Sequence, residues 1–376
     1  NDVDLNNKKI LIVVGEHRPF TDRQQKALDD FCEYHNAVVY VNHLSNYKGD
    51  YSIAANLLVS CGGLSILKPD ILITVGGQTG DYSIYNALQT IGNVEHWRVS
   101  EDGAYVDTYG HLTRIFECPD YYFFEKLDNS KGSDHSYFNE WEQLASTINY
   151  DVELPFSNTY VAQQLHNNIP HDSIMNFAIL NSLRSWSYFP LAAGIQGYAN
   201  VAAFGIDGCN SMLFGESMNT DKLCFIVTGD LAFFYDMNVL GIRHLKNNIR
   251  VLLINNGGGA EFKIMTGAWK ENPHVERYIS ANGHYGSTKG WAENCGFKYL
   301  TVSNKDEFTE VSSQFLDYSE QPVVLEVFTK EDDDALAVKT LIEANRHFSD
   351  SDKMKKILTN VIGEKGVKMI RSIIGK

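Results

Sequence analysis

The chain has 376 residues, too many for one ordinary hydrophobic core, so we expect about two or three domains. It carries 32 Lys and Arg against 47 Asp and Glu, and the formal net charge of −15 disfavours nucleic acid and anionic membranes as partners. No apolar run approaches the roughly 18 residues that span a bilayer, and six scattered cysteines without a Cys-x-x-Cys pair are typical of a reduced, cytoplasmic protein.

Apolar, β-rich runs alternate with helical patterns from end to end, which indicates a parallel α/β architecture. The expected strands of the first unit are Ile10–Val14, Val38–Val41, Asp70–Val75, Trp97–Val99, Leu112–Phe116 and Tyr121–Phe124. Its expected helices are Asp22–Tyr34, Tyr51–Ser60 and Ser83–Leu88. The unit lacks a Gly-x-Gly-x-x-Gly fingerprint, so the pattern predicts a Rossmann-like domain without that loop.

A polar stretch at Asp128–His135 is the expected linker, and Phe138–Tyr150 is the expected amphipathic helix that leads into a second unit. The expected strands of that unit, again separated by helices, are Ile174–Leu180, Leu223–Thr228, Val251–Asn255, Tyr299–Val302 and Val323–Phe328. The predicted fold class is therefore α/β, with two doubly wound, mainly parallel sheets in domains 1–150 and 151–376.

Three further features invite a functional interpretation, but a structural one is favoured for each. The acidic run Glu331–Asp334 is more typical of a solvated loop or a helix start than of a metal site. The basic, amphipathic stretch Asp352–Lys376 is expected to pack as a surface helix on its own domain or on a partner subunit. His284 could act as an acid or base, yet a turn or cap histidine is the preferred interpretation.

The most informative feature is a pair of expected strands that each end in an oxygen ligand and glycine. Asp230 follows one strand and Asn256 follows the next, 26 positions later, across a crossover helix expected at Ala232–Leu245. A carboxylate, an amide oxygen and the backbone carbonyl of Gly258 would suit Mg²⁺ that holds a diphosphate. Taken alone, either half is equally typical of a turn after a buried strand.

At this spacing, the residues Gly229-Asp230, Asn256 and Gly258 resemble the thiamine diphosphate signature. A wider resemblance to the MenD synthase family covers nearly the entire chain. It is carried by the segments Phe177–Ser182, Gly205–Gly208, Gly229–Asn238 and Asn255–Phe262, with Leu67–Gly77 and His96–Val99 resembling the family's central domain. MenD makes 2-succinyl-5-enolpyruvyl-6-hydroxy-3-cyclohexene-1-carboxylate from 2-oxoglutarate and isochorismate.

The resemblance implies a Rossmann-like central domain, a thiamine diphosphate-binding domain, and roles for particular residues. Asp230, Asn256 and Gly258 would be the Mg²⁺ ligands, and Ile206 would hold thiamine in its bent shape. Ile206 is otherwise an ordinary core residue, and Asn181-Ser182 otherwise a helix cap. The implied cofactor-binding positions are Asn181, Ser182, Gly205, Ile206, Gly229, Asp230, Leu231, Ala232, Asn256, Gly258, Gly259 and Phe262.

Several positions depart from the family pattern. Val201 lies just beyond an Asn that the family follows with an Arg, and Trp186 aligns with a second family Arg. Arg184 is displaced from that position by two residues, which turns a helical side chain by roughly 200°. Glu261 adds a negative charge at an apolar position, and Ala232 replaces a phosphate-binding Ser. These changes disfavour an acceptor pocket for a dicarboxylate.

The family's activating Glu belongs to an N-terminal pyrimidine-binding domain, and the chain is expected to begin directly at the central domain. The catalytic residue is therefore unknown here, and the missing half of the site is expected from a neighbouring subunit of a homodimer or tetramer. We expect a Mg²⁺- and thiamine diphosphate-dependent 2-oxo acid decarboxylating carboligase of MenD type, inactive as this chain alone. The alternatives are a decarboxylase or acyloin synthase with another acceptor, and a non-catalytic cofactor-binding or assembly module.

Overall fold

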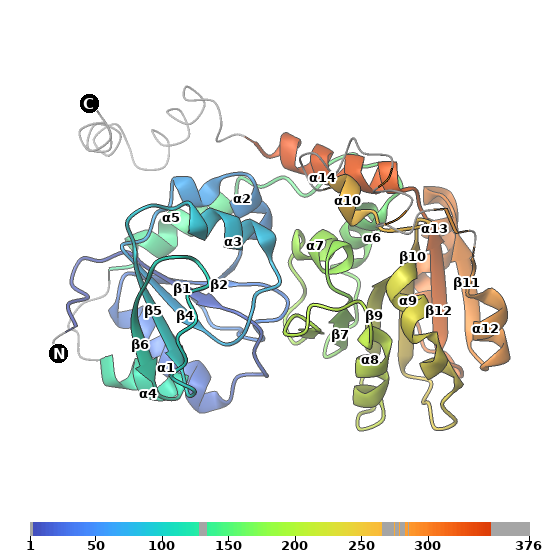
Figure 1. The fold of residues 1–376 in the computed structure, drawn as a ribbon, viewed down its shortest axis with the longest axis horizontal. Coiled ribbons are helices and arrows are strands. Elements are labelled where there is room, and N and C mark those ends of the chain that lie inside the picture. The colour runs from blue at the N-terminus through green and yellow to red at the C-terminus, as the bar shows by residue number, and fades with distance from the viewer. Residues whose placement is uncertain are drawn as a thin grey trace.

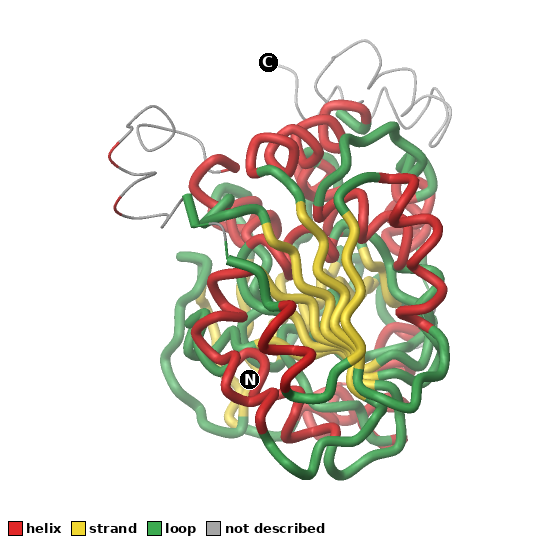
Figure 2. Tube along the Cα trace, turned by 90° about the vertical axis from the view of Figure 1, so that its right-hand side faces the viewer, coloured by secondary structure: helices red, strands yellow, loops and turns green. Residues whose placement is uncertain are grey.

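The computed structural model describes residues 3–127, 134–264, 274, 278, 283, 284 and 286–346. It confirms the predicted fold class, because the described residues form two six-stranded sheets in which every strand pair is parallel. The two units lie side by side in Figure 1, and helices cover both faces of the sheet seen in Figure 2. Most of the expected linker, residues 128–133, and all of Asp352–Lys376 lie outside the described residues.

The first sheet has the strand order β3-β2-β1-β4-β5-β6. The sequence order of the strands across the sheet reverses between β1 and β4, as in a Rossmann fold. Its strands are β1 Ile10–Val14, β2 Ala37–Val41, β3 Ser52–Ala54, β4 Ile71–Val75, β5 Glu95–Ser100 and β6 Leu112–Glu117. Its helices are α1 Asp22–Tyr34, α2 Asn56–Ser60, the 3₁₀ turn η1 Gly63–Ser65, α3 Tyr82–Gln89, α4 Asp120–Leu127 and α5 Ser136–Ala145.

Two predictions in this unit were wrong. Tyr121–Phe124 is part of helix α4, whose buried Phe123 and Phe124 pack in a hydrophobic core of the first unit. Burial on a helical face therefore overrides the β preference of aromatic residues. The range Tyr51–Ser60 is divided between the short edge strand β3, which pairs with β2, and helix α2.

The second sheet has the order β11-β12-β10-β9-β7-β8. Its strands are β7 Ile174–Phe177, β8 Gln196–Ala199, β9 Cys224–Gly229, β10 Ile249–Asn255, β11 Lys298–Val302 and β12 Val323–Phe328. Its helical elements are α6 Asn158–Leu165, α7 Asn181–Ser187, α8 Cys209–Ser217, α9 Asp230–Asp236, η2 Met237–Gly241, α10 Glu261–Ile264, α12 Lys289–Asn294, α13 Lys305–Leu316 and α14 Glu331–Ala344. β8 was not predicted, and the helix expected over Ala232–Leu245 ends as α9 at Asp236 before a 3₁₀ turn.

The two units are joined by a shared hydrophobic core and by direct hydrogen bonds. One cluster of buried side chains runs from Leu11 in β1 to Val327 in β12. Asn46 of the first unit accepts from the Gly197 amide at 2.9 Å and donates to the Gly197 carbonyl at 2.9 Å. A Cβ at Gly197 would lie 2.0 Å from the His43 carbonyl oxygen, so this strand must present glycine to the first unit.

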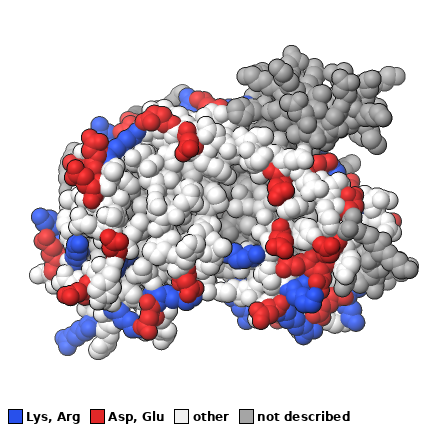
Figure 3. All heavy atoms as spheres, turned by 180° about the vertical axis from the view of Figure 1, so that it is seen from behind, with Lys and Arg blue, Asp and Glu red and all other residues white. Residues whose placement is uncertain are grey.

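The cysteine thiols and the surface charges can be compared with what the composition predicts. All six cysteines are free, and four of them are buried. No helix among the described residues is long and apolar enough to cross a membrane. On the face in Figure 3, acidic and basic side chains lie interspersed toward the margins, around a broad area of uncharged side chains.

We predict that Asn46→Ala lowers the free energy of unfolding by about 2–4 kcal/mol, because it leaves the N–H and C=O of Gly197 without their partner at a buried contact. Urea and thermal unfolding measure the change. The exposed Asn93 offers a matched control, since Asn93→Ala is expected to stay within about 0.5 kcal/mol of the parent. Equal stability of Asn46→Ala and the parent would show that the contact does not hold the units together.

Candidate functional site

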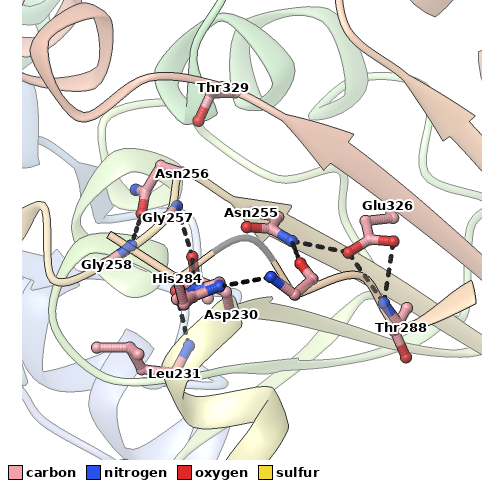
Figure 4. Close-up of polar contacts among 12 residues, drawn as sticks. Asp230, Leu231, Asn255, Asn256, Gly257, Gly258, His284, Thr288, Glu326 and Thr329 are labelled. Atoms are coloured by element: carbon pink, nitrogen blue, oxygen red, sulfur yellow. Dashed lines mark hydrogen bonds and ion pairs between the residues drawn. The ribbon is translucent and has the colours of Figure 1, made fainter. Parts of the chain in front are cut away.

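The pairing of β9 with β10 brings the two halves of the predicted motif together. Gly229, the last residue of β9, is in register with Ile254 of β10. Asp230 and Asn256 therefore follow adjacent strands at the same carboxyl edge of the sheet (Figure 4). The amide of Gly257 donates to Asp230 Oδ2 at 2.8 Å and ties the two loops directly to each other.

Asp230 is a buried carboxylate, with only 2% of its surface exposed. Its Oδ1 accepts from the Leu231 amide at 2.7 Å, and its Oδ2 lies 3.0 Å from His284 Nε2. Burial raises the pKa of Asp230 above its usual value, although the hydrogen bonds from Gly257, Leu231 and His284 act against this rise. Such a carboxylate is stabilised by a bound cation, because burying an unpaired anion is costly.

His284 contacts both a nearby backbone amide and the site. Its Nδ1 accepts from the Gly286 amide at 3.1 Å, so Nε2 is the ring nitrogen that carries a proton toward Asp230. Nε2 can then donate to Asp230, as Figure 4 illustrates. No local pattern predicts this contact with Asp230, because 54 residues separate the two side chains.

Asn256 is held by a second buried carboxylate, Asp334 in the first turn of α14. Asn256 Nδ2 donates to Asp334 Oδ2 at 2.7 Å. Asp334 is 1% exposed, and burial raises its pKa to about 6. The predicted helix start at Glu331–Asp334 is confirmed. The alternative prediction of a solvated run was wrong for Glu331 and Asp334, which are both buried.

Periodicity could have identified Asp334. The side chains at Glu331, Asp334, Val338 and Leu341 recur at helical spacing, and all are buried in α14. A carboxylate on the apolar face of a helix is unusual unless it has partners. The helical spacing of these residues, rather than the charge of the acidic run, indicates that Asp334 is buried.

Glu326 is a third buried carboxylate near this edge, and the sequence analysis did not identify it. It is fully buried in β12 and accepts from Asn255 Nδ2 at 2.8 Å. Its Oε2 also accepts from Ser287 Oγ and Tyr299 Oη, each at 2.7 Å. The Thr288 amide lies 3.2 Å from the same carboxylate (Figure 4). A lone Glu in the otherwise apolar strand Val323–Phe328 was the available signal.

The sequence-predicted cofactor positions follow four strands that are neighbours in the sheet, β8, β7, β9 and β10. Asn181 and Ser182 begin α7 after β7, and Gly205 and Ile206 lie between β8 and α8. The remaining positions lie at the end of β9 or follow β9 and β10, namely Gly229, Asp230, Leu231, Ala232, Asn256, Gly258, Gly259 and Phe262. The topology therefore gathers the predicted positions at one edge of the sheet.

The start of α7 has an unusual backbone. Leu180, which precedes Asn181, has φ of 65° and ψ of −122°, a conformation that is costly for a side chain of this size. No side chain caps this helix, so the alternative of Asn181-Ser182 as a helix cap is not realised. Asn158 donates from Nδ2 to the Asn181 carbonyl at 3.2 Å and from its amide to Asp334 at 2.8 Å, which links the α7 start to Asn256.

The positions where family arginines were expected are core positions. Trp186 and Val201 are both fully buried. Arg184 forms two hydrogen bonds with Glu261, at 2.8 and 2.7 Å, and their side chains are only 15% and 9% exposed. Glu261 is therefore not a free negative charge, because Arg184 neutralises it. The pair lines a cavity of about 880 Å³ that Tyr82 and residues of α14 also line.

The donor set at the β9 and β10 ends fits a hard cation. Within the described residues, no group of three or more His, Cys, Asp or Glu could hold a metal ion. Asp230 is the one carboxylate among the predicted ligands, and Asn256 and Gly258 would contribute an amide and a backbone oxygen. This set suits Mg²⁺, which is usually held by one or two carboxylates together with substrate phosphates.

Comparison with known proteins identifies the second unit. Residues 173–327 match the family described as thiamine pyrophosphate enzyme, C-terminal TPP binding domain. The matched range runs from β7 into β12 of the second unit and contains Asp230 and Asn256.

Curated relatives confirm the resemblance to MenD. The chain is 36% identical over 279 residues to the 2-succinyl-5-enolpyruvyl-6-hydroxy-3-cyclohexene-1-carboxylate synthase of Bacteroides thetaiotaomicron, which covers 73% of this chain and 49% of that protein. The synthases of Phocaeicola vulgatus and Bacteroides fragilis are each 34% identical, over 279 and 278 residues, covering 73% and 72% of this chain and 49% of each relative. The chain spans about half the length of the curated relatives it matches.

We predict that Arg184→Leu or Glu261→Leu alone lowers the free energy of unfolding by about 3 kcal/mol, since each leaves a largely buried charge without its partner. The double variant is expected to recover much of this loss. A double-mutant cycle in urea measures the coupling, and Lys26→Ala, at an ion pair with the lysine 74% exposed, serves as the surface control. Additive losses would show that the two charges do not stabilise each other.

Proposed function

We propose that this chain binds the diphosphate of thiamine diphosphate through Mg²⁺, with Asp230 and Asn256 as side-chain ligands and Gly258 as a carbonyl ligand. The observation that carries the proposal is the hydrogen bond from Gly257 to Asp230, which joins the two ligand loops at one sheet edge. The family of residues 173–327, whose description names TPP binding, supports the same occupant.

The protein's contribution to catalysis would be binding and orientation. Bound thiamine diphosphate supplies an electron sink for decarboxylation of 2-oxo acids. Asp230 would provide the negative charge that holds the cation, and its burial strengthens that attraction. Ile206, which is partly buried between two hydrophobic clusters, would support the thiamine ring from the β8 side.

We further propose that the full site spans two chains. Residues 1–150 would serve as the central domain and residues 151–376 as the diphosphate-binding domain. A pyrimidine-binding domain of a neighbouring subunit, in a homodimer or tetramer, would carry the activating Glu. This chain alone would then bind the cofactor weakly and catalyse no turnover.

The reaction that we propose is a 2-oxo acid decarboxylation followed by transfer to an acceptor, as in a MenD-type carboligase of menaquinone biosynthesis. The similarity to three synthases supports MenD's own substrates, 2-oxoglutarate and isochorismate. The ion pair between Arg184 and Glu261 favours a second candidate, a decarboxylase or acyloin synthase whose acceptor is not a dicarboxylate, because Arg184 is already occupied.

We predict that Asp230→Ala abolishes Mg²⁺-dependent binding of thiamine diphosphate and leaves the fold intact, since the variant removes the only carboxylate of the proposed ligand set. Calorimetry with and without Mg²⁺ measures this binding, and circular dichroism checks the fold. Asp221, whose side chain is fully exposed, provides the control variant Asp221→Ala. Unchanged affinity in Asp230→Ala would refute the assigned ligand.

We predict that CO₂ release from 2-oxoglutarate requires the chain, Mg²⁺, thiamine diphosphate and a pyrimidine-binding domain together. Consumption of isochorismate in the same mixture, followed by mass spectrometry of the product, would establish the MenD reaction. CO₂ release without isochorismate consumption would instead favour the decarboxylase alternative. Cofactor binding without turnover of any 2-oxo acid in the complete assembly would favour a non-catalytic module.

A further inference from the structure

Asp334 lies at a junction of three chain segments. Its Oδ1 accepts from the amide of Asn158 at the first turn of α6, at 2.8 Å. Its Oδ2 accepts from Asn256 Nδ2 at 2.7 Å and from Thr329 Oγ1 at 3.2 Å. Both carboxylate oxygens are thus used, and the side chain is 1% exposed. α14 itself packs on α6 and α10, which holds this turn against the edge of the sheet.

The contact with Asp334 determines which way the Asn256 amide faces. An ionised carboxylate has only acceptors, so it can pair with Asn256 through the nitrogen and not through the oxygen. Asn256 Oδ1 is therefore turned toward the Gly258 amide, 3.3 Å away, on the side of the site (Figure 4). If the amide were rotated by half a turn, it would present an NH₂ group, which cannot coordinate a cation.

We propose that Asp334 is a positioning residue for the cation site, which keeps the oxygen of Asn256 directed at the metal. This inference rests on the proposed function, because it takes Asn256 as a ligand. Asp334 does not need to touch the cation or the cofactor. Its role is that of an outer hydrogen-bond partner, which orients a metal ligand and whose loss typically lowers metal affinity by about 10–100-fold.

The neighbouring acidic residues do not share this role. Glu331 and Asp332 lie 3.2 and 3.0 Å from Lys263 of α10, so these two residues form ion pairs on another side of the helix start. Asp334, in contrast, is hydrogen-bonded to the proposed ligand Asn256. Asp333, which is partly exposed one position earlier, therefore offers a control with the same chemical change.

Exchange of the two side chains gives a sharp test. In Asp334→Asn, the new amide can keep its oxygen on the Asn158 N–H, but its NH₂ then faces the NH₂ of Asn256. Asn256 must rotate to accept this hydrogen bond, and its oxygen leaves the site. In the double variant Asn256→Asp/Asp334→Asn, the new amide donates to the new carboxylate, whose second oxygen can face the cation. The net charge of the site is unchanged.

Mn²⁺ binding to the protein in the presence of thiamine diphosphate, followed by electron paramagnetic resonance, measures the cation affinity without any need for turnover. We expect an affinity about 10–100-fold weaker in Asp334→Asn, and recovery to within about threefold of the parent in the double variant. Asp333→Asn is expected to bind Mn²⁺ like the parent. Thermal unfolding of each variant reports on the contact with α6.

The outcomes distinguish a failure of the proposed function from a failure of the positioning role of Asp334. Metal-independent cofactor binding by the parent protein would overturn the proposed function itself. Parent-like Mn²⁺ affinity in Asp334→Asn, with metal-dependent binding intact in the parent, would overturn the positioning role alone. A loss that the double variant does not recover would also overturn it, because the double variant restores both the pairing with residue 256 and the net charge of the site, and both variants keep the α6 contact.

Discussion

The parallel pairing of β9 with β10 is the constraint on which the candidate site depends. The register sets Gly229 beside Ile254, so each strand delivers its polar residue to the same edge. The two consecutive asparagines at the end of β10 have different partners. Asn255 is held by Glu326 and Asn256 by Asp334. A slip of one residue would exchange these partners and present the wrong asparagine to the site.

Buried carboxylates organise this edge of the protein. Asp230, Glu326 and Asp334 each accept at least three hydrogen bonds, which offsets part of the cost of removing a charge from water. Glu326 and Asp334 accept hydrogen bonds from side chains of the protein itself. Asp230 differs, because its partners are two backbone amides and the imidazole of His284, so it is the carboxylate that a bound cation would stabilise most.

Local patterns predicted those parts of the fold that local physics controls. Helix α1 spans the predicted residues because Thr21 and Gln24 form a reciprocal cap at its start. Strand β1 is buried at every position, as a continuous apolar run predicts for a central parallel strand. The same reasoning predicted a strand at Tyr121–Phe124 and was wrong, since an aromatic run suits either a strand or a buried helix face. Only the packing of this run in the hydrophobic core of the first unit decides between a strand and a helix.

The sequence by itself determined the α/β architecture, the Asp230 and Asn256 motif and the resemblance to MenD, because each depends on residue types at short or regular spacing. Tertiary structure alone decided the partners of those residues. Asn256 meets Asp334 across 78 positions, and Arg184 meets Glu261 across 77. No local pattern encodes contacts at such separations. They arise because parallel strands with helical crossovers bring remote loops to one edge, where a buried charge persists only if the fold supplies its partner.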